Sequence, residues 1–271
     1  MQKTGIGKVV VCYLFTCFDH QENIEKFIKH YRKYKSGIDH NLLICFKMLK
    51  EKDILLIKNF LKKVNYRLFI DPVETNDFDF GSYKRVAQLH HDKLILFLNS
   101  HSYPICDDWL SILLNNNENN TLIGTSASNE SLYNTIKLKK KYKFFSYFVK
   151  KFILKKKFYP FPNPHIRTSS FLIYGQLFLN YMIDKNLKSK ENAWEIESGK
   201  KSLTNYFKQK KYPVYIINSD GEKFTETNWM YSETYCYSKQ SKSIISDKHT
   251  RKYLSLSEKD RTLSQIKVWG Q

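Results

Sequence analysis

Apolar runs of strand length alternate with amphipathic stretches along the first half of the chain. The apolar runs occupy residues 8–15, 41–49, 66–73, 93–100 and 121–128. The stretches between them repeat apolar residues at helical spacing, in 23–37, 51–64, 82–90 and 106–117. Continuous apolar strands separated by helices are typical of a parallel sheet covered on both faces. The pattern therefore predicts an α/β fold with a mostly parallel central sheet flanked by helices.

The apolar positions also predict which side of a helix faces the sheet. In the stretch 23–37, the residues expected to point inward are Ile24, Phe27, Ile28 and Tyr31. In the stretch 51–64, they are Leu55, Ile57 and Leu61. The helix within 106–117 is expected to begin at Asp107 or Asp108, because acidic residues are favoured at a helix N-terminus.

The alternation stops after residue 135. The segment 137–157 contains ten lysines and no acid. Its apolar residues at helical spacing include Phe145, Phe148, Val149 and Phe152. We therefore expect a basic amphipathic helix that ends before Pro160. Beyond it, strands are predicted at 168–175 and 212–221, and helices at 177–187 and 198–210. The chain is interpreted as one domain, 1–271, in three parts: 1–135, 136–160 and 161–271.

The formal net charge of the 271 residues is +19. Such an excess favours polyanionic partners: nucleic acid, anionic lipid or phosphorylated substrates. Lysines beside aromatic side chains in 137–157 fit the interface of an anionic membrane. They also fit nucleic acid, where aromatic rings stack on bases, or a helix that packs on the core with a solvated outer face. The many lysines without an acid favour the membrane.

The five cysteines are scattered and form no Cys-x-x-Cys pair, which argues against a zinc site and a disulfide framework. They are expected to be the reduced thiols of a cytosolic protein. No run reaches the roughly 18 apolar residues of a spanning helix, and the short run 9–15 is followed by no signal-peptide cleavage site. The sequence therefore predicts a protein that is soluble or peripherally bound to a membrane.

Polar residues follow several of the predicted strands. Ligands bind beyond the carboxyl ends of the strands in parallel sheets, and the corresponding segments are 16–20, 71–77, 99–102 and 126–129. No glycine-rich phosphate loop follows the first strand, and the chain contains no Gly-x-Ser-x-Gly and no His-Glu-x-x-His motif. Dinucleotide-binding, P-loop, serine-hydrolase and zinc-protease chemistry are therefore not indicated.

Five segments occur in an order that matches a known family. They are FTCFDH (15–20), DFDFGSYKRVAQ (77–88), LILFLNSHSYPICDDWL (94–110), NAWEIESG (192–199) and ISDKHTRKYLSLSEKDRTLSQIKVWG (245–270). In these segments the chain resembles the GT-A glycosyltransferases, close to the bacterial family-2-like and rhamnan-synthesis enzymes of surface polysaccharide assembly. The resemblance implies a Rossmann-like GT-A fold with a basic helical insertion and a C-terminal extension. It also implies transfer of a sugar, of the hexosyltransferase type, from a nucleotide sugar to a surface-glycan or lipid-linked acceptor.

The resemblance further implies where the nucleotide sugar binds. It points to Thr16, Phe18 and Asp19 after the first strand, and to Asp79 with Gly81 after the third. A carboxylate accepts hydrogen bonds from a base edge or a ribose hydroxyl, and a glycine lets the backbone approach a ligand. The alternative for Asp79 is that it caps its helix. The residues 1–135 would then form the nucleotide-sugar-binding half, and 161–271 the acceptor-binding half and tail.

These enzymes usually carry an Asp-x-Asp motif that holds a divalent ion against the diphosphate, and this chain has Asn99, Ser100 and His101 there. Magnesium and manganese prefer anionic oxygens, so a divalent cation is doubtful and no cofactor is certain. Two possibilities stay open: His101 and His249 ligate a metal, or cationic side chains neutralise the diphosphate without one. The candidates for the second are Lys84, Lys248 and Arg251. The alternative for His101 is that it is an ordinary polar residue of the loop.

The acidic stretch at 192–199 matches the family's catalytic segment, which implies Glu197, or else Glu195, as the base that deprotonates the acceptor in an inverting transfer. Residues two apart diverge on a helix, so only one is expected to face the site. The alternative is two first-turn acids that complement the helix dipole.

His165 and Arg167 lie on a proline-stiffened loop that would bind an anionic acceptor or the diphosphate, unless the loop is simply solvated. We expect a cytoplasmic enzyme, peripheral to the inner face of the membrane. The alternatives are a nucleic-acid-binding protein and an inactive relative of the transferases.

Overall fold

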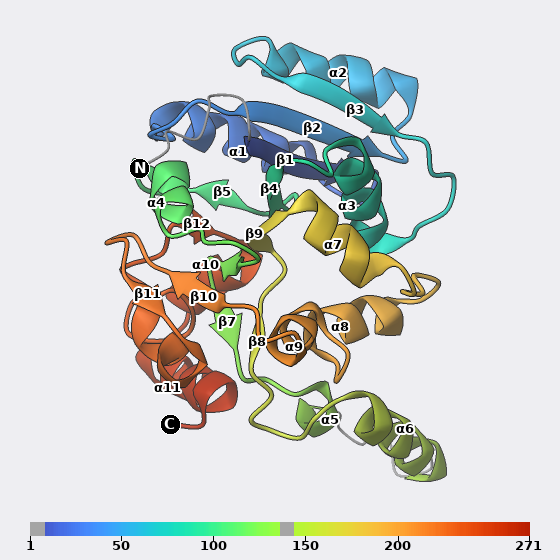
Figure 1. Cartoon of the computed structure of the whole chain (residues 1–271), viewed down its shortest axis with the longest axis vertical. Coiled ribbons are helices and arrows are strands. Elements are labelled where there is room, and N and C mark those ends of the chain that lie inside the picture. Colours follow the sequence, from blue (N-terminus) through green and yellow to red (C-terminus); the bar gives the residue numbers. More distant parts are fainter. Residues whose placement is uncertain (1–8, 136–143) are drawn as a thin grey trace.

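The computed structural model describes residues 9–135 and 144–271. Its centre is an eight-stranded sheet (Figure 1) with the strand order β11-β10-β6-β9-β4-β1-β2-β3. The strands are β1 (Val9–Thr16), β2 (Asn41–Lys47), β3 (Arg67–Asp71), β4 (Leu94–Leu98), β6 (Leu122–Gly124), β9 (Ser170–Tyr174), β10 (Val214–Ile217) and β11 (Lys223–Phe224).

Most neighbours in this sheet are parallel. β1 pairs in parallel with β2 and β4, β2 with β3, and β6 with β10. The exceptions are β9, which is antiparallel to both β4 and β6, and β11 at the edge. The predicted Rossmann-like α/β fold with a mostly parallel central sheet is confirmed. The periodicity located β9 correctly but could not give its direction, which depends on the path of the chain before it.

The predicted strand 121–128 is divided into two. β6 ends at Gly124, and β7 (Ala127–Ser128) pairs instead with β8 (His165–Ile166) in a separate two-stranded sheet. A side chain at Gly124 would lie 2.6 Å from Ile166 Cγ2, so the glycine lets the two segments pack closely. A second small sheet joins β5 (Tyr103–Pro104) to β12 (Ile245–Ser246) and brings the C-terminal part beside β4.

Helices cover both faces of the central sheet. They are α1 (Gln21–Lys33), α2 (Glu51–Leu61), α3 (Phe78–Leu89), α4 (Trp109–Asn115), α5 (Leu132–Thr135), α6 (Phe144–Lys157), α7 (Gly175–Met182), α8 (Lys190–Ser198), α9 (Leu203–Gln209), the 3-10 helix η2 (Glu226–Ser232), α10 (Lys248–Leu254) and α11 (Glu258–Trp269). Alternate residues of β1 point to opposite faces: Cys12 packs with α3 and α7, whereas Tyr13 packs with α1 and α4. The two core layers therefore follow from the alternation along the strands.

The inward faces of two helices were predicted with different success. Ile24 and Phe27 of α1 are buried, as expected. In α2 the prediction for Leu55 is wrong: this side chain is 65% exposed, and Ile54 is buried in its place. Ile54 lies three residues before the buried Ile57, which places both on one helical face, whereas Leu55 lies only two before it.

Helix α4 begins where it was predicted to begin, but without the capping hydrogen bond that an acid at this position usually makes. Asp108 occupies the N-cap position but has a left-handed backbone with φ of 58° and makes no side-chain capping hydrogen bond. The carboxylate of Asp107 accepts a hydrogen bond from the backbone N–H of Lys35 at 2.7 Å. Neither acid caps the helix, because tertiary contacts to the end of α1 determine their conformation.

The basic helix is present as α6, and the predicted residues 137–143 lie outside the described ranges, as does the side chain of Phe145. Leu154 and Phe158 are buried and attach this segment to the body, whereas Phe152 is 60% exposed. The aromatic stripe therefore faces away from the core. In Figure 1, α6 lies at the lower end of the molecule, beyond α8 and α9. No helix in the described ranges is both long and apolar enough to cross a bilayer.

Candidate functional site

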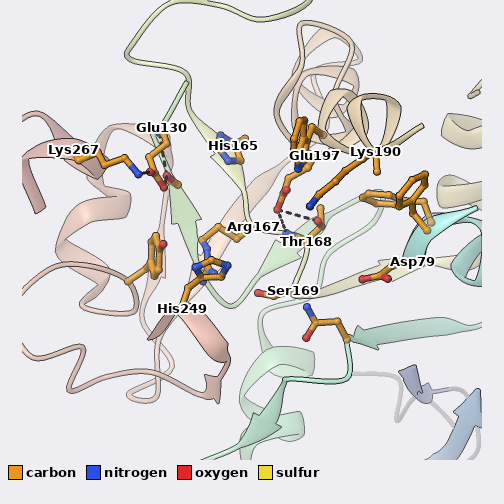
Figure 2. A pocket seen from close by; sticks show the side chains of 17 residues that line it. Asp79, Glu130, His165, Arg167, Thr168, Ser169, Lys190, Glu197, His249 and Lys267 are labelled. Carbon is orange, nitrogen blue, oxygen red and sulfur yellow. Dashed lines mark hydrogen bonds and ion pairs between the residues drawn. The ribbon is translucent and has the colours of Figure 1, made fainter. Parts of the chain in front are cut away.

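A cavity of about 430 Å³ opens at the edge of the sheet where β4 ends, between α3 and α8. Asn99 follows β4, Ser169 precedes the antiparallel β9, and Asp79 stands at the start of α3, so all three reach the same edge. Figure 2 shows Glu197 and Lys190 on one side of the cavity, and Glu130, Lys267 and His249 on the other. Its volume falls within the range of small-molecule sites, roughly 300–1,000 Å³.

Glu197 lines the cavity from α8. Its Oε1 accepts hydrogen bonds from the backbone N–H of Thr168 at 3.1 Å and from the Thr168 hydroxyl at 3.0 Å. Both donors bind the same oxygen, and within the described ranges nothing donates to Oε2. The carboxylate is therefore held in orientation by one oxygen, and the other is available to a ligand.

Glu195 faces the opposite way. Lys157 at the end of α6 lies 3.3 Å from Glu195 Oε2 and 2.9 Å from Glu191 Oε1. Helix α8 therefore presents one side to the cavity and another to α6. Of the two predicted bases, the geometry leaves only Glu197 at the cavity, which agrees with the expectation that residues two apart on a helix diverge.

Asp79 lines the cavity across from Glu197 and has no hydrogen-bond or ion-pair partner among the described residues. Burial raises the pKa of its carboxyl to about 6, and the nearby charges of Asp19 and Glu197 add to this. The alternative that Asp79 caps α3 is wrong, because the N-cap position is Asp77 and no side chain caps this helix. Asp79 is thus an unpaired, partly buried acid at the cavity.

Gly81 lies against the carboxylate of Asp77. A Cβ at this position would lie 1.9 Å from Asp77 Oδ2. The Asp77 carboxylate is held there by Lys47 Nζ at 2.5 Å and by Arg85 Nη1 at 2.6 Å. Gly81 is buried and makes room for this ion-pair network, and it does not line the cavity.

The loops after β1 and β4 meet, as the strand-end argument predicted. Asp19 Oδ2 accepts hydrogen bonds from the Thr16 N–H at 2.8 Å and the Thr16 hydroxyl at 2.7 Å. Its Oδ1 accepts one from the Ser100 hydroxyl at 2.5 Å and lies 3.9 Å from His101 Nε2. Asp19 therefore connects the two loops, and Phe18, its neighbour in the loop after β1, is 65% exposed.

The position of the Asp-x-Asp motif provides no anionic ligand. Asn99 Oδ1 accepts hydrogen bonds from the His101 N–H at 3.2 Å and the Ser102 hydroxyl at 2.8 Å, and so stabilises its own turn. Burial lowers the pKa of both His101 and His249. No three His, Cys, Asp or Glu side chains converge on a metal position within 9–135 and 144–271. These residues do not fit a hard divalent cation.

Of the three cationic residues predicted to neutralise the diphosphate, two lie beside the loop after β4 and one does not. Lys84 donates to the backbone carbonyl of Met182 on α7 at 3.1 Å, outside the cavity. Arg251 donates to the carbonyl of His101 at 3.0 Å, and its guanidinium lies 4.8 Å from the Tyr103 ring. Lys248 is exposed, and its charge contributes to the lowered pKa of His101 after burial. Arg251 and Lys248 therefore flank the loop after β4, and Lys84 does not.

Arg167 belongs to a buried ion pair. Its Nη1 lies 2.7 Å from Asp247 Oδ2, and its guanidinium lies 3.7 Å from the ring of Tyr235. Burial opposes the charge on Asp247, but Arg167 and the N–H group of Thr250 hold the pKa of this carboxyl far below its usual range. Asp247 also caps α10 and receives the His249 N–H at 2.7 Å. The alternative of a merely solvated loop is wrong for Arg167.

His165 is also buried, with 7% of its surface exposed. Its Nδ1 donates to the carbonyl of Asn163 at 2.8 Å, which leaves Nε2 as an acceptor without a partner among the described residues. Burial lowers the pKa of His165, although the charge of Glu197 opposes this. The imidazole lines the cavity, and its burial disfavours the charged form.

Several cavity residues were missed from the sequence. They include Lys190, Trp194, Thr168, Glu130, Lys267 and Tyr235. Asp247, the partner of the lining residue Arg167, was also missed. For Lys190 and Trp194 a signal existed, because they precede Glu197 by seven and three residues and so share its helical face. For Asp247 no local signal existed, because its partner Arg167 lies far away in the sequence and the contact depends on the small β5–β12 sheet.

Comparisons with known proteins show only distant likeness. No protein-family model matches the chain. No curated protein matches it either. Among solved structures, the apo-form glycosyltransferase GlyE of Streptococcus pneumoniae TIGR4 is 12% identical over 78% of this chain, with a TM-score of 0.44. This chain spans only 45% of the GlyE structure.

Two further structures are similar to the same degree. The 4-diphosphocytidyl-2C-methyl-D-erythritol synthase of Anaerococcus prevotii is 11% identical over 83% of this chain and 95% of its own, with a TM-score of 0.44. The mannosyltransferase PcManGT of Pyrobaculum calidifontis, in complex with GDP-Man and Mn²⁺, is 7% identical over 85% of this chain and 61% of its own, with a TM-score of 0.45.

Proposed function

We propose that this protein is a glycosyltransferase that moves a sugar from a nucleotide-sugar donor to a hydroxyl of a surface-glycan or lipid-linked acceptor. The observation that carries the proposal is the Glu197 carboxylate, which Thr168 holds toward a cavity at the carboxyl edge of the sheet. Ligands of open α/β sheets bind at this edge. The order of the segments that resemble the GT-A enzymes supports the same activity.

In the proposed reaction, Glu197 accepts the proton of the acceptor hydroxyl. The acceptor oxygen forms a bond to the anomeric carbon of the donor sugar on the face opposite the leaving group. The bond between that carbon and the phosphate oxygen breaks, and its electron pair leaves with the nucleotide. The configuration at the anomeric carbon is inverted. A correctly placed base of this kind contributes on the order of 10²- to 10⁴-fold to the rate.

The donor is proposed to lie along the loops after β1 and β4. The exposed ring of Phe18 offers a surface for the nucleotide base. The unpaired carboxylate of Asp79 would accept hydrogen bonds from donor hydroxyls, because a partly buried acid without a partner gains most from them. Lys248 and Arg251 would offset the negative charge of the phosphates from the side of His101.

No step is assigned to a metal ion. The neutral Asn99 and His101 stand where carboxylates would be needed, and the described residues offer no set of three ligands. Cationic side chains are therefore proposed to stabilise the departing nucleotide.

The acceptor is proposed to reach the site at the inner face of a membrane. Phe148, Val149, Phe152 and Ile153 are all exposed on α6, among lysines and without an acid. A helix of this composition fits the interface of a bilayer that contains anionic lipid. The segment 137–157 would thus hold the enzyme peripherally to the membrane, on its cytoplasmic side.

The experiment is a panel of UDP-, GDP-, dTDP- and CMP-linked sugars incubated with the purified protein. Released nucleotide and sugar transferred to a mixture of saccharide acceptors are measured, together with the binding of each free nucleotide by calorimetry. At least one nucleotide should bind and its sugar should be consumed. Binding without turnover would indicate the inactive relative, and binding of no nucleotide would remove the proposal.

A further inference from the structure

One of the four tryptophans differs from the others, and the structure describes all four. Trp109, Trp229 and Trp269 are 0%, 1% and 8% exposed. Each of their indole N–H groups donates to a backbone carbonyl, at 3.4, 3.2 and 2.9 Å respectively. Trp194 is only partly buried, and no described residue accepts a hydrogen bond from its N–H. A large ring with an unpaired donor at a cavity wall is available to a ligand.

Trp194 shares the cavity wall with two other functional groups. Lys190, Trp194 and Glu197 are spaced by four and three residues, so they form one stripe along α8. All three line the cavity, and Lys190 Nζ lies 5.3 Å from the centre of the Trp194 indole. Ala193, the small residue beside them, also lines the cavity. The indole therefore shares this wall with a cation that lies over its ring and with the proposed base.

The other positive charges of the cavity are already neutralised. Arg167 is paired with Asp247 at 2.7 Å, and Lys267 with Glu130 at 2.6 Å.

Burial lowers the pKa of the two lining histidines, His165 and His249, and so disfavours their charged forms. Among the described lining residues, this leaves Lys190 as the one cation with no carboxylate partner. An unpaired lysine at a cavity favours an anionic ligand group.

We infer that Lys190 and Trp194 form the acceptor-binding site, and that the acceptor is a saccharide carrying an anionic group next to the ring that stacks on Trp194. This inference deepens the proposed function and rests on it. The C–H face of a sugar ring is apolar and weakly positive, so it packs on the negative face of an indole. The indole N–H and Lys190 then bind the polar edge and the anionic group. A hydroxyl on the far side of the ring is directed toward Glu197, three residues along the stripe.

The anionic group is a phosphate or a carboxylate, and the test separates these two sources. Binding of glucose 1-phosphate, methyl glucuronide and methyl glucoside to the full-length protein is measured by saturation-transfer NMR and by tryptophan fluorescence. Glucose 1-phosphate or methyl glucuronide should bind at least about tenfold more tightly than methyl glucoside, because a charge-assisted contact is added. Equal affinities for all three probes would overturn the inference.

Variants assign the binding to these two residues. Lys190→Gln should remove the preference for the anionic probe, whereas Lys188→Gln, outside the cavity, should keep it. Trp194→Ala should weaken all three probes about 3- to 10-fold, and Trp194→Phe should restore most of the loss through its remaining ring. Thermal unfolding shows that each variant is folded. Unchanged probe binding in folded Trp194→Ala, or an undiminished preference in Lys190→Gln, would contradict the assignment.

Nucleotide binding distinguishes a failure of this inference from a failure of the proposed function. UDP and GDP affinities are measured for the wild type and for Lys190→Gln. If the variant loses nucleotide affinity and keeps its preference among the saccharide probes, Lys190 serves the donor and the acceptor site is wrong. If no nucleotide binds the wild type while the anionic saccharide binds at Trp194, the transferase proposal fails and the saccharide site remains.

Discussion

Asp77 and Asp79 stand two residues apart at the start of α3, yet their surroundings are opposite. Burial would raise the pKa of Asp77, but its hydrogen bonds to Arg85 and Lys47 outweigh this and lower it. Asp79 has the same burial effect without such partners, and its pKa rises to about 6. The first carboxylate fastens α3 to β2, and the second costs stability as long as no ligand reaches it. Two acids within one helical turn therefore have different roles: the paired acid stabilises the fold, and the unpaired acid is available to bind a ligand.

The same contrast recurs around the cavity. Arg167 has a buried carboxylate partner, whereas Lys190 has none among the residues that the structure describes. On α8, Glu195 is paired with Lys157, whereas Glu197 has one carboxylate oxygen to which no described residue donates. Paired groups should affect folding when they are changed, and unpaired ones should affect ligands. The predictions below test this division, beginning with the largest effect.

The pair Glu197 and Glu195 should give the largest difference. Glu197→Gln removes the proposed base and keeps the acceptor for the Thr168 hydrogen bonds, so transfer should fall about 10²- to 10⁴-fold with nucleotide affinity unchanged. Glu195→Gln breaks only a partly exposed ion pair, which is worth less than about 1 kcal/mol, and should leave the transfer rate unaltered. Both are measured by steady-state transfer and by nucleotide calorimetry. Equal rates in the two variants would require another base.

Among the variants proposed here, breaking the buried pair Arg167–Asp247 should change the free energy of unfolding the most. Asp247→Asn leaves the Arg167 charge buried without a partner and should lower the free energy of unfolding by about 3–5 kcal/mol at pH 7. The folded pKa of Asp247 is depressed, so its contribution is present above its unfolded pKa of about 3.9 and is lost as the pH falls below that value. The difference between wild type and variant should therefore shrink at pH 3. Urea denaturation at both pH values measures it, and a difference that stays constant would contradict the pairing.

Asp77→Asn and Asp79→Asn should change stability in opposite directions. The first removes the partner of the buried Lys47 and should cost about 2–3 kcal/mol. The second replaces an acid whose folded pKa, about 6, exceeds its usual 3.8, and ionisation of such a group costs stability as the pH rises through this interval.

Asp79→Asn should therefore be more stable than wild type by about 1–3 kcal/mol at pH 8, and this gain should vanish below about pH 4. Unfolding curves at pH 4 and pH 8 measure the stability of both variants. Nucleotide titrations measure how far the Asp79→Asn variant loses affinity for the donor. A destabilised Asp79→Asn at pH 8 would indicate a structural role for this acid.

Substitution of single lysines in α6 should give the smallest effect. Lys155 has no carboxylate partner in the described ranges, whereas Lys157 is bound by Glu191 and Glu195. Lys155→Ala should weaken sedimentation with vesicles of mixed anionic and neutral lipid about fivefold, which corresponds to about 1 kcal/mol per basic residue. Lys157→Ala should have a smaller effect. Equal binding of the wild type to neutral vesicles, or binding to single-stranded DNA in place of vesicles, would contradict the membrane assignment.

The sequence predicted those parts of the fold that depend on local pattern. The strands β1 to β4 and helices α1 to α3 follow directly from apolar periodicity. The short pairs β5–β12 and β7–β8 were not predicted, because two-residue strands carry no periodic signal and form through contacts distant in sequence. The error at Leu55 was avoidable: Ile54, Ile57 and Leu61 have the spacing of one helical face, and Leu55 does not.

The site was predictable to the extent that its residues share an element. The choice of Glu197 over Glu195 is a property of one helix, and the same reasoning extended by one turn would have reached Trp194 and Lys190. The role of Arg167 was not predictable, because it is determined by Asp247 in a later part of the chain. For the same reason, the sequence could not separate Asp77 from Asp79: their difference lies in Lys47 and Arg85.

Helix α8 contacts the cavity on one side and Lys157 of α6 on the other. Insertion or deletion of a single residue in this helix would rotate everything after it by about 100°. Such a change would turn Glu197 away from Thr168 and detach Glu195 from Lys157 in the same event. Two contacts on opposite sides therefore constrain the length of this nine-residue helix. Related sequences should differ here by substitutions and not by insertions or deletions.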